Sequence, residues 1–144
     1  MSDMNIARAG SPEPQVTAAS EPQGPTIAAS VVVPTYNEAQ NLPELVRRIC
    51  ASLPSVEVVV VDDASKDGTA DVARELGKSF PVKVVERVNE RGLSTAVLRG
   101  LREAQNDICV VMDADLSHPP ESIPRMVRAI QDGAEVVVGS RYVR

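Results

Sequence analysis

The chain has 144 residues, of which 43% are hydrophobic but only 2% aromatic, and a formal net charge of -5 at pH 7. This length suits one domain, or part of a larger one, with an aliphatic core. The acidic charge and the lack of a basic stripe with interleaved aromatic residues argue against nucleic-acid binding. No run of residues approaches the ~18 apolar residues of a membrane span, and the N-terminus has no signal-peptide pattern, so we expect a cytoplasmic protein.

Residues 1–27 are rich in Pro, Ser, Ala, Gln and Gly and poor in bulky apolar side chains. Such a composition buries too little surface to offset the entropy of ordering, so we predict a disordered N-terminal tail. Residues 28–144 are expected to form one domain. Its two cysteines, Cys50 and Cys109, lie in apolar periodic segments, which indicates buried free thiols in a reducing compartment.

Segments typical of strands and of helices alternate from residue 28 onward. Valine-rich apolar runs predict strands at 28–33, 57–61, 82–85, 108–112 and 136–138. Hydrophobic residues at helical spacing predict helices at 42–53, at 72–76 after a start at 67–69, at 93–104 and at 123–130. This alternation, with strands apolar on both faces, predicts an α/β fold with a mostly parallel sheet and flanking helices.

Polar clusters follow each predicted strand, at residues 35–38, 62–67, 89–94, 113–118 and 140–141. Parallel sheets bind ligands beyond the carboxyl ends of their strands, so we expect these clusters to meet in one site.

The strongest candidate is the pair Asp113 and Asp115, directly after the apolar run 108–112. Residues spaced i, i+2 at the end of a strand share a face, so both carboxylates can point into the same space. Two such groups repel unless a cation lies between them, and they suit Mg²⁺ or Mn²⁺ that also binds phosphate oxygens. Ser117 has the same parity and is a candidate third ligand. For His118, the single histidine, a loop position is favoured over a general-base role.

The segment after the first strand combines Pro34, which ends the strand pairing, with Tyr36 and Glu38. Tyr36 can stack on a base and Glu38 can bind a ribose, while Asn37 or Asn41 can cap the next helix. A capped loop alone does not explain one of only two tyrosines at this place, so we favour a functional role.

The second strand ends in Asp62 and Asp63, which can accept hydrogen bonds from a ribose or a base, or can form a turn. The residues leave these two alternatives open. For Ser65, Asp67 and Thr69 a structural role in the turn and helix cap is favoured.

Two arginines follow later strands. Arg91 can meet a phosphate beside Gly92, which permits a close backbone approach at the start of the next helix, although a plain loop explains the pattern equally well. Arg141 can clamp a diphosphate with two hydrogen bonds, and a lone surface arginine is the alternative.

Five motifs in order resemble family 2 glycosyltransferases of the GT-A fold, most closely the polyprenol-phosphate (dolichol-phosphate) mannosyltransferases. The motifs are VVVPTYNE, VVVVDDASKDGT, ERGLSTAVLRGL, VVMDADLSHPPE and VVVGSRY. The resemblance implies the Rossmann-like, nucleotide-binding N-terminal part of that fold, truncated to the donor half without the acceptor half.

The resemblance also implies residue roles. The implied contacts to a nucleotide-sugar donor are Pro34, Tyr36, Glu38, Val61, Asp63, Asp113, Ala114, Asp115 and Arg141. Asp115 is the implied catalytic residue, and Asp113, Asp115 and Ser117 are the implied ligands of Mg²⁺ or Mn²⁺. Some relatives carry Gln where Ser117 stands.

The implied reaction transfers mannose from GDP-mannose to a polyprenyl phosphate at a membrane surface, with inversion. A metal ion would neutralise the departing nucleoside diphosphate, and the acceptor phosphate, whose second pKa is about 6, needs no general base. The expected partners are the donor, the lipid acceptor and a membrane protein or second copy, and the expected location is the cytoplasmic face of a membrane. The alternative is a non-catalytic nucleotide- or metal-binding fragment of the same fold.

Two other classes fit less well. A phospho-accepting signalling domain needs an aspartate after the third strand and a lysine after the last, where residues 86–87 and 139–141 have neither. A dinucleotide-binding oxidoreductase needs a glycine-rich turn where Pro34 stands.

Overall fold

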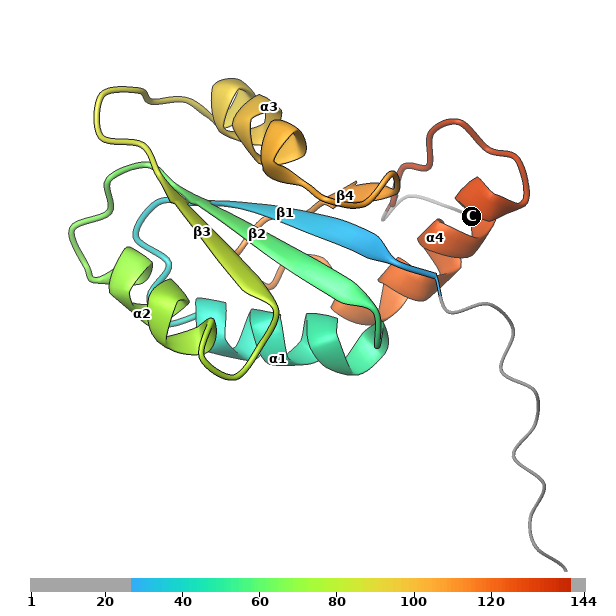
Figure 1. Cartoon of the computed structure of the whole chain (residues 1–144), viewed down its shortest axis with the longest axis horizontal. Coiled ribbons are helices and arrows are strands. Elements are labelled where there is room, and N and C mark those ends of the chain that lie inside the picture. Colours follow the sequence, from blue (N-terminus) through green and yellow to red (C-terminus); the bar gives the residue numbers. More distant parts are fainter. Residues whose placement is uncertain (1–26, 141–144) are drawn as a thin grey trace, which may run out of the picture.

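The computed structural model describes residues 27–140. A four-stranded parallel sheet in the order β3-β2-β1-β4 forms its centre (Figure 1). The strands are β1 (Ala29–Thr35), β2 (Val56–Asp62), β3 (Val82–Glu86) and β4 (Cys109–Val111). The predicted tail, apart from Ile27, lies outside the described residues and stays a prediction.

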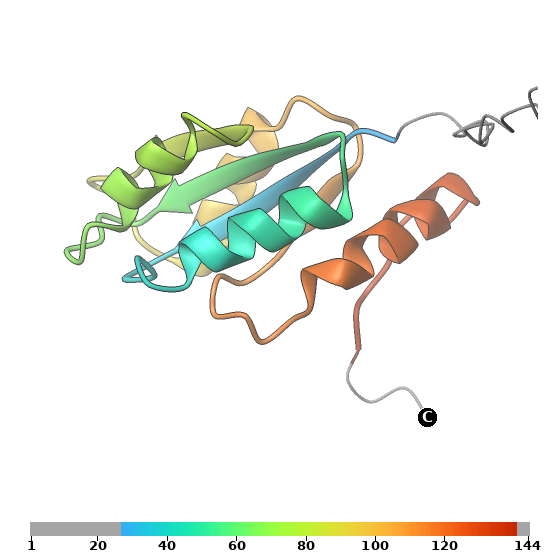
Figure 2. The ribbon, with the colours of Figure 1, turned by 90° about the horizontal axis from the view of Figure 1, so that it is seen from below.

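Helices cover both faces of the sheet, as the apolar strands predict. They are α1 (Leu42–Ser52), α2 (Thr69–Leu76), α3 (Leu93–Glu103), the 3-10 turn η1 (Pro120–Ser122) and α4 (Ile123–Gln131). Helix α3 lies on one face, while α1 and α2 lie on the other (Figure 1). Figure 2 shows α4 beside α1. The α/β fold with a parallel sheet is therefore confirmed. No helix within residues 27–140 has the length and apolar character needed to span a bilayer.

The two faces of the sheet carry separate cores because successive valines point to opposite sides. Val31 and Val33 of β1 pack into the larger core with α1 and α4. Val32 packs into a smaller core under α3, which also contains Val59, Val61, Val85 and Ala96. Burial on both sides explains why the strands read as continuous valine runs.

Helix α3 approaches the sheet closely at Gly100. A Cβ atom at this position would overlap the side chain of Val32 and lie 3.0 Å from Val61 Cγ2. The absence of a side chain at Gly100 therefore sets how near α3 lies to β1 and β2.

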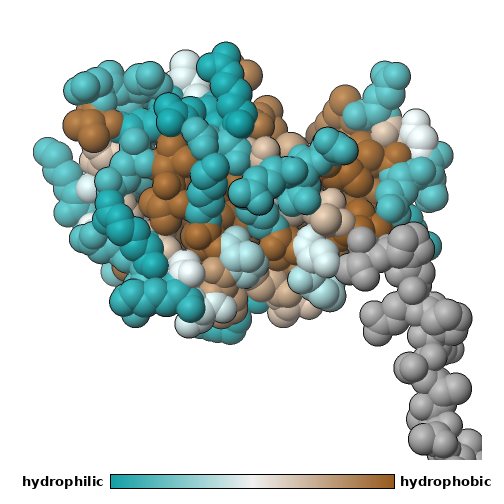
Figure 3. All heavy atoms as spheres, in the orientation of Figure 1, coloured by the Kyte–Doolittle hydropathy of each residue, from teal (hydrophilic) through white to brown (hydrophobic). Residues whose placement is uncertain are grey.

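The predicted fifth strand is wrong. Residues 136–138 pair with no strand among residues 27–140, and Val136 and Val138 are 78% and 81% exposed. Figure 3 shows apolar surface beside α4 and this segment. Valine favours strands, but a strand also needs a hydrogen-bonding partner, which local sequence cannot supply.

The two cysteines are free thiols, as predicted, but their expected burial is wrong for Cys109. Cys109 is exposed and Cys50 is half-buried. Cys109 and Val111 lie on the β4 face opposite Val110, which points into the larger core. Because α3 covers β1 and β2 rather than β4, this face stays open to solvent.

Candidate functional site

The loops that follow the four parallel strands leave the same edge of the sheet. They comprise residues 36–41, 63–68, 87–92 and 112–119, and we call them together the strand-end site. The pairing of Thr35 with Asp62, and of Asp62 with Glu86, brings the first three loops side by side (Figure 1).

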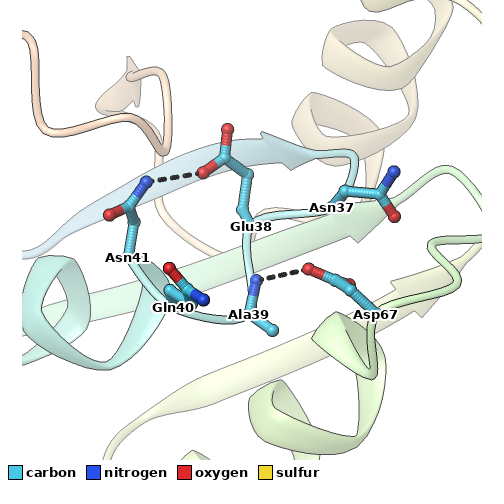
Figure 4. A pocket seen from close by; sticks show the side chains of 6 residues that line it. All are labelled: Asn37, Glu38, Ala39, Gln40, Asn41 and Asp67. Carbon is cyan, nitrogen blue, oxygen red and sulfur yellow. Dashed lines mark hydrogen bonds between the residues drawn. The ribbon is translucent and has the colours of Figure 1, made fainter.

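The loops after β1 and β2 are joined by side chains that bind backbone amides. Asp67 Oδ2 accepts a hydrogen bond from the Ala39 N–H at 3.0 Å (Figure 4), and Thr69 Oγ1 accepts one from the Glu38 N–H at 2.9 Å. Asp67 Oδ1 also accepts a hydrogen bond from the Thr69 N–H at 3.0 Å. Asp67 and Thr69 therefore have the structural role that their sequence context favours.

Asn37 and Ser65 complete this connection. The Asn37 N–H donates to Ser65 Oγ at 2.8 Å, and the Lys66 N–H donates to Asn37 Oδ1 at 3.1 Å. Asn37 has a φ of 57°, a left-handed conformation that asparagine tolerates better than most residues. The expectation that Asn37 can cap α1 is wrong, because its side chain holds the neighbouring loop instead.

Asn41 occupies the N-cap position of α1, but its side chain makes no capping hydrogen bond. It donates to Glu38 Oε2 at 2.9 Å, as Figure 4 shows. These residues, with Asn37, Ala39, Gln40 and Asp67, line a shallow cavity of about 350 Å³. The Glu38 carboxylate therefore lies in the wall of this cavity, within the strand-end site.

The two aspartates after β2 have different environments. Asp62 is 1% exposed and accepts hydrogen bonds from Thr35 Oγ1 at 2.9 Å and Ser65 Oγ at 2.6 Å. Asp62 therefore shapes the turn. Asp63 instead points toward the loop after β3, where Arg87 Nε and Nη2 donate to its two oxygens at 2.6 and 2.7 Å.

Arg87 was not among the residues that sequence reasoning selected. Its side chain is 2% exposed, and a buried guanidinium requires a paired carboxylate. Burial raises the pKa of Asp63, but hydrogen bonds from Arg87 and Gly92 and the positive charges of Arg87 and Arg91 lower it below its usual value overall. The one sequence feature that could have identified Arg87 as a site residue is its position directly after an apolar strand.

Tyr36 and Arg91 meet at the surface of the site. Tyr36 is 51% exposed, and Arg91 Cζ lies 5.8 Å from the centre of its ring, within range of a cation–π interaction. The tyrosine ring is thus accessible for stacking, with a positive charge beside it.

The acidic pair after β4 follows the alternation of a strand. Met112 and Ala114 are buried, whereas Asp113 and Asp115 are exposed. Both carboxylates therefore lie on the solvent side of the segment. Neither forms an ion pair with a cationic side chain of residues 27–140. Two negative charges that no ion pair neutralises are a suitable binding place for a cation.

A tight turn orients the second carboxylate. Leu116 has a φ of 61°, and the Ser117 N–H donates to Asp115 Oδ1 at 2.9 Å. Interaction with the Ser117 side chain and backbone lowers the pKa of Asp115. Ser117 Oγ, the predicted third ligand, lies 3.0 Å from His118 Nδ1.

No group of three or more His, Cys, Asp or Glu side chains in the described part of the chain could hold a metal ion. The pair Asp113 and Asp115 would therefore share a cation with oxygens from a ligand or water. Magnesium and manganese bind in this way when phosphate oxygens complete the coordination.

The loop that carries the acidic pair is fastened to α1. Arg48 donates from Nε and Nη2 to the two carboxylate oxygens of Glu121 at 2.8 and 2.7 Å. The Arg48 guanidinium lowers the pKa of Glu121 to about 2. Ser52 Oγ adds a hydrogen bond to the Pro120 carbonyl at 3.2 Å. This anchor was also missed from the sequence, because it joins residues far apart in the chain.

The remaining candidates differ in accessibility. The side chains of Val61 and Ala114 are buried, so only their backbone atoms can meet a ligand. Pro34 is half-buried within β1, and the expectation that it ends the strand pairing is wrong, because the pairing with β2 continues to Thr35. Arg141 lies outside the described residues. A further cavity of about 680 Å³, between β4 and α4, has Asp113, His118 and Arg125 in its lining.

The sequence model of glycosyl transferase family 2 matches residues 30–144. A dolichol-phosphate mannosyltransferase of Pyrococcus furiosus is 54% identical over 117 residues, which make up 80% of this chain and 33% of the relative. A polyprenol monophosphomannose synthase of Mycolicibacterium smegmatis is 44% identical over 125 residues, or 83% of this chain and 47% of the relative. The chain thus spans between a third and a half of these relatives.

Solved structures of glycosyltransferases share the fold. A mannosyltransferase of Pyrobaculum calidifontis in complex with GDP-Man and Mn²⁺ has a TM-score of 0.61 and 34% identity, over 72% of this chain and 31% of that one. A glucosyl-3-phosphoglycerate synthase of Mycobacterium tuberculosis with Mn²⁺, UDP-Glc and phosphoglyceric acid has a TM-score of 0.62 and 27% identity, over 74% and 40%. The chain therefore belongs to glycosyl transferase family 2 and has the α/β fold of the GT-A structures.

Proposed function

We propose that this chain supplies the donor-binding part of an inverting glycosyltransferase that moves mannose from GDP-mannose to a polyprenyl or dolichyl phosphate. The observation that carries the proposal is the pair of exposed carboxylates, Asp113 and Asp115, which form no ion pair within residues 27–140 and lie at the edge where Tyr36 and Asp63 are also found. Relatives named as dolichol-phosphate mannosyltransferases support the choice of sugar and acceptor.

Asp113 and Asp115 would hold the Mg²⁺ or Mn²⁺ ion, and a neighbour in complex with GDP-Man and Mn²⁺ supports a divalent cation. When bound, the ion supplies positive charge against the diphosphate that departs from the sugar. Ser117 orients Asp115 through its backbone N–H, and its hydroxyl oxygen, 3.0 Å from His118 Nδ1, would be the third protein ligand of the ion.

The remaining residues bind and orient the donor. Tyr36 stacks on the base, and the carboxylates of Glu38 and Asp63 accept hydrogen bonds from ribose and base. Arg91 and Arg141 contact the diphosphate with their guanidinium groups. The acceptor phosphate is itself the nucleophile, so the absence of a general base from this proposal is consistent with its chemistry.

The acceptor places the reaction at the cytoplasmic face of a membrane, with the lipid phosphate delivered from the bilayer surface. A membrane protein or a second copy of the chain is the further partner in this proposal.

A second candidate is a non-catalytic module of the same fold that binds nucleotide and metal, a role that the exposed carboxylates of Asp113 and Asp115 would serve equally well. Two measurements on the full chain separate the candidates. Calorimetric titration with GDP and Mn²⁺ tests donor binding, and transfer of radiolabelled mannose from GDP-mannose to polyprenyl phosphate tests turnover.

We expect GDP to bind with Mn²⁺ and radiolabel to appear in the lipid fraction. Binding without transfer would favour the non-catalytic module. An equal affinity for GDP and UDP would contradict the assignment of guanosine, and no binding of either nucleotide would contradict both candidates.

A further inference from the structure

Arg87 lies in the strand-end site at the end of the edge strand β3, and it is almost inaccessible to solvent. It directly follows β3, and its side chain is 2% exposed. Its guanidinium forms two parallel hydrogen bonds with Asp63, which is itself 13% exposed at the side chain. A donor can therefore reach the edge of Asp63 while Arg87 remains behind it.

The same guanidinium holds the loop between β3 and α3. Arg87 Nη2 donates to the Gly92 carbonyl at 3.0 Å, and Nη1 donates to Thr95 Oγ1 at 2.8 Å. The Gly92 N–H donates to Asp63 Oδ2 at 3.1 Å. Gly92 has a φ of 122°, which residues with side chains rarely adopt. Arg87 thus connects the end of β2, the end of β3 and the first turn of α3.

This loop also carries Arg91 to its place over Tyr36, 5.8 Å from the ring centre. Gly92, which Arg87 fixes through its carbonyl, is the next residue along the chain. A change at Arg87 therefore alters both Asp63 and Arg91 without removing either of them.

We propose that Arg87 is a positioning residue of the donor site, which holds the carboxylate of Asp63 and the guanidinium of Arg91 in the arrangement that receives a nucleoside diphosphate. This inference rests on the proposed function, because it assumes that the strand-end site binds the donor. A site held in place before binding loses less conformational freedom when the ligand arrives.

The charges around Asp63 predict how the loss of Arg87 will show itself. Arg87 and Arg91 face the carboxylate, Glu90 lies 3.3 Å from Arg87 Nη1, and the neighbouring Asp62 is held by Thr35 and Ser65. Burial raises the pKa of Asp63, and Arg87 is the main group that opposes this effect. Without Arg87 the carboxyl group becomes protonated at higher pH, and its protonated oxygen then donates a hydrogen bond instead of accepting one.

The test measures GDP affinity with Mn²⁺ by calorimetry between about pH 5 and pH 8 for the full chain and its variants. We expect Arg87→Lys to weaken binding by about 10-fold to 100-fold, the range for groups that orient a binding residue. Arg87→Met should weaken it further and add a loss of affinity toward acid pH. Arg102→Met removes an exposed positive charge from α3 and is the matched control.

Circular dichroism establishes whether each variant is folded, and Thr95→Val provides a milder change if Arg87→Met is not. Thr95→Val removes one contact of Arg87 and should weaken GDP binding while leaving Asp63 paired. Unchanged affinity in Arg87→Lys and Thr95→Val, or a loss in Arg87→Met that is equal at every pH, would overturn the inference. Failure of the unmodified chain to bind GDP would instead contradict the proposed function.

Discussion

Asp113 and Asp115 place two negative charges on the exposed side of one short segment, and neither forms an ion pair with a described residue. A protein gains nothing in stability from such a pair, because like charges repel. The arrangement is therefore more informative about ligand binding than about folding.

Asp115→Ala should reduce the affinity for GDP-mannose with Mn²⁺ to the level seen without Mn²⁺, because one of two metal-binding carboxylates is lost. Asp113→Asn should have the same effect, while its unfolding temperature without metal stays equal or rises as repulsion decreases. Calorimetry and thermal unfolding check both results. Unchanged Mn²⁺-dependent affinity in Asp115→Ala would contradict the metal assignment.

Tyr36 offers a test of base stacking. Its ring is 51% exposed, so Tyr36→Ala should leave the fold intact but weaken GDP binding by about 1–3 kcal/mol, the contribution of one stacked base. Tyr36→Phe keeps the ring and serves as the control with near-normal affinity. If Tyr36→Ala binds GDP as tightly as Tyr36→Phe and the unmodified chain, the ring does not contact the base.

The sequence could predict those residues of the site whose place at the end of a strand and whose spacing along the chain already indicate a role. Asp113 and Asp115 fall at the end of an apolar strand with a spacing that matches the alternation of a strand. Arg87 and Asp63 are 24 positions apart, and only the folded sheet reveals their pairing. Asn37 was misjudged for the same reason, because its partner Lys66 lies in another loop.

At the level of elements, the packing of α3 depends on Gly100. Alanine normally favours a helix over glycine by about 1 kcal/mol, so Gly100→Ala would stabilise an exposed helix. Here the new methyl group overlaps Val32, and we expect the free energy of unfolding to fall by about 1–3 kcal/mol. Urea denaturation checks the sign. A gain in stability would show that α3 can move away from the sheet at little cost.

The link between η1 and α1 predicts a dependence on pH. The Arg48 guanidinium lowers the pKa of Glu121 from 4.5 to about 2, so the pair contributes its full stability above pH 4.5 and loses it as the pH falls through 2. Glu121→Gln should therefore show a shallower fall in unfolding free energy between these values. Glu75→Gln, which removes an exposed pair with Lys78, is the control. Identical pH profiles for Glu121→Gln and the unmodified chain would contradict the assignment.

Strands and helices were predictable where the local sequence pattern agrees with the contacts that the segment makes in the folded chain. The predicted strand 57–61 lies within β2, whose valines fill cores on both sides. The segment 136–138 has the same composition but pairs with no strand of the described chain. Composition therefore predicted the tendency to form a strand, whereas pairing depends on contacts that a local pattern does not contain.

At the scale of the whole molecule, ligand binding and stability should be coupled. A ligand that binds only the folded chain raises its unfolding free energy, by about 2.7 kcal/mol at 100 times its dissociation constant. We expect GDP to raise the unfolding temperature only when Mn²⁺ is present, and to have no such effect in Asp115→Ala. An equal increase without Mn²⁺ would show that the nucleotide binds independently of the acidic pair.

The two faces of the sheet are unequally filled, since the larger core joins α1 and α4 while α3 rests on a core of few residues. Amide hydrogens of α3 should therefore exchange with deuterium sooner than those of α1, through partial openings that leave the rest of the fold intact. Because α3 begins next to Gly92 and Arg87, a bound donor would close these openings and slow the exchange. Deuterium exchange at α3, the less tightly packed layer of the molecule, would then show whether the donor is bound.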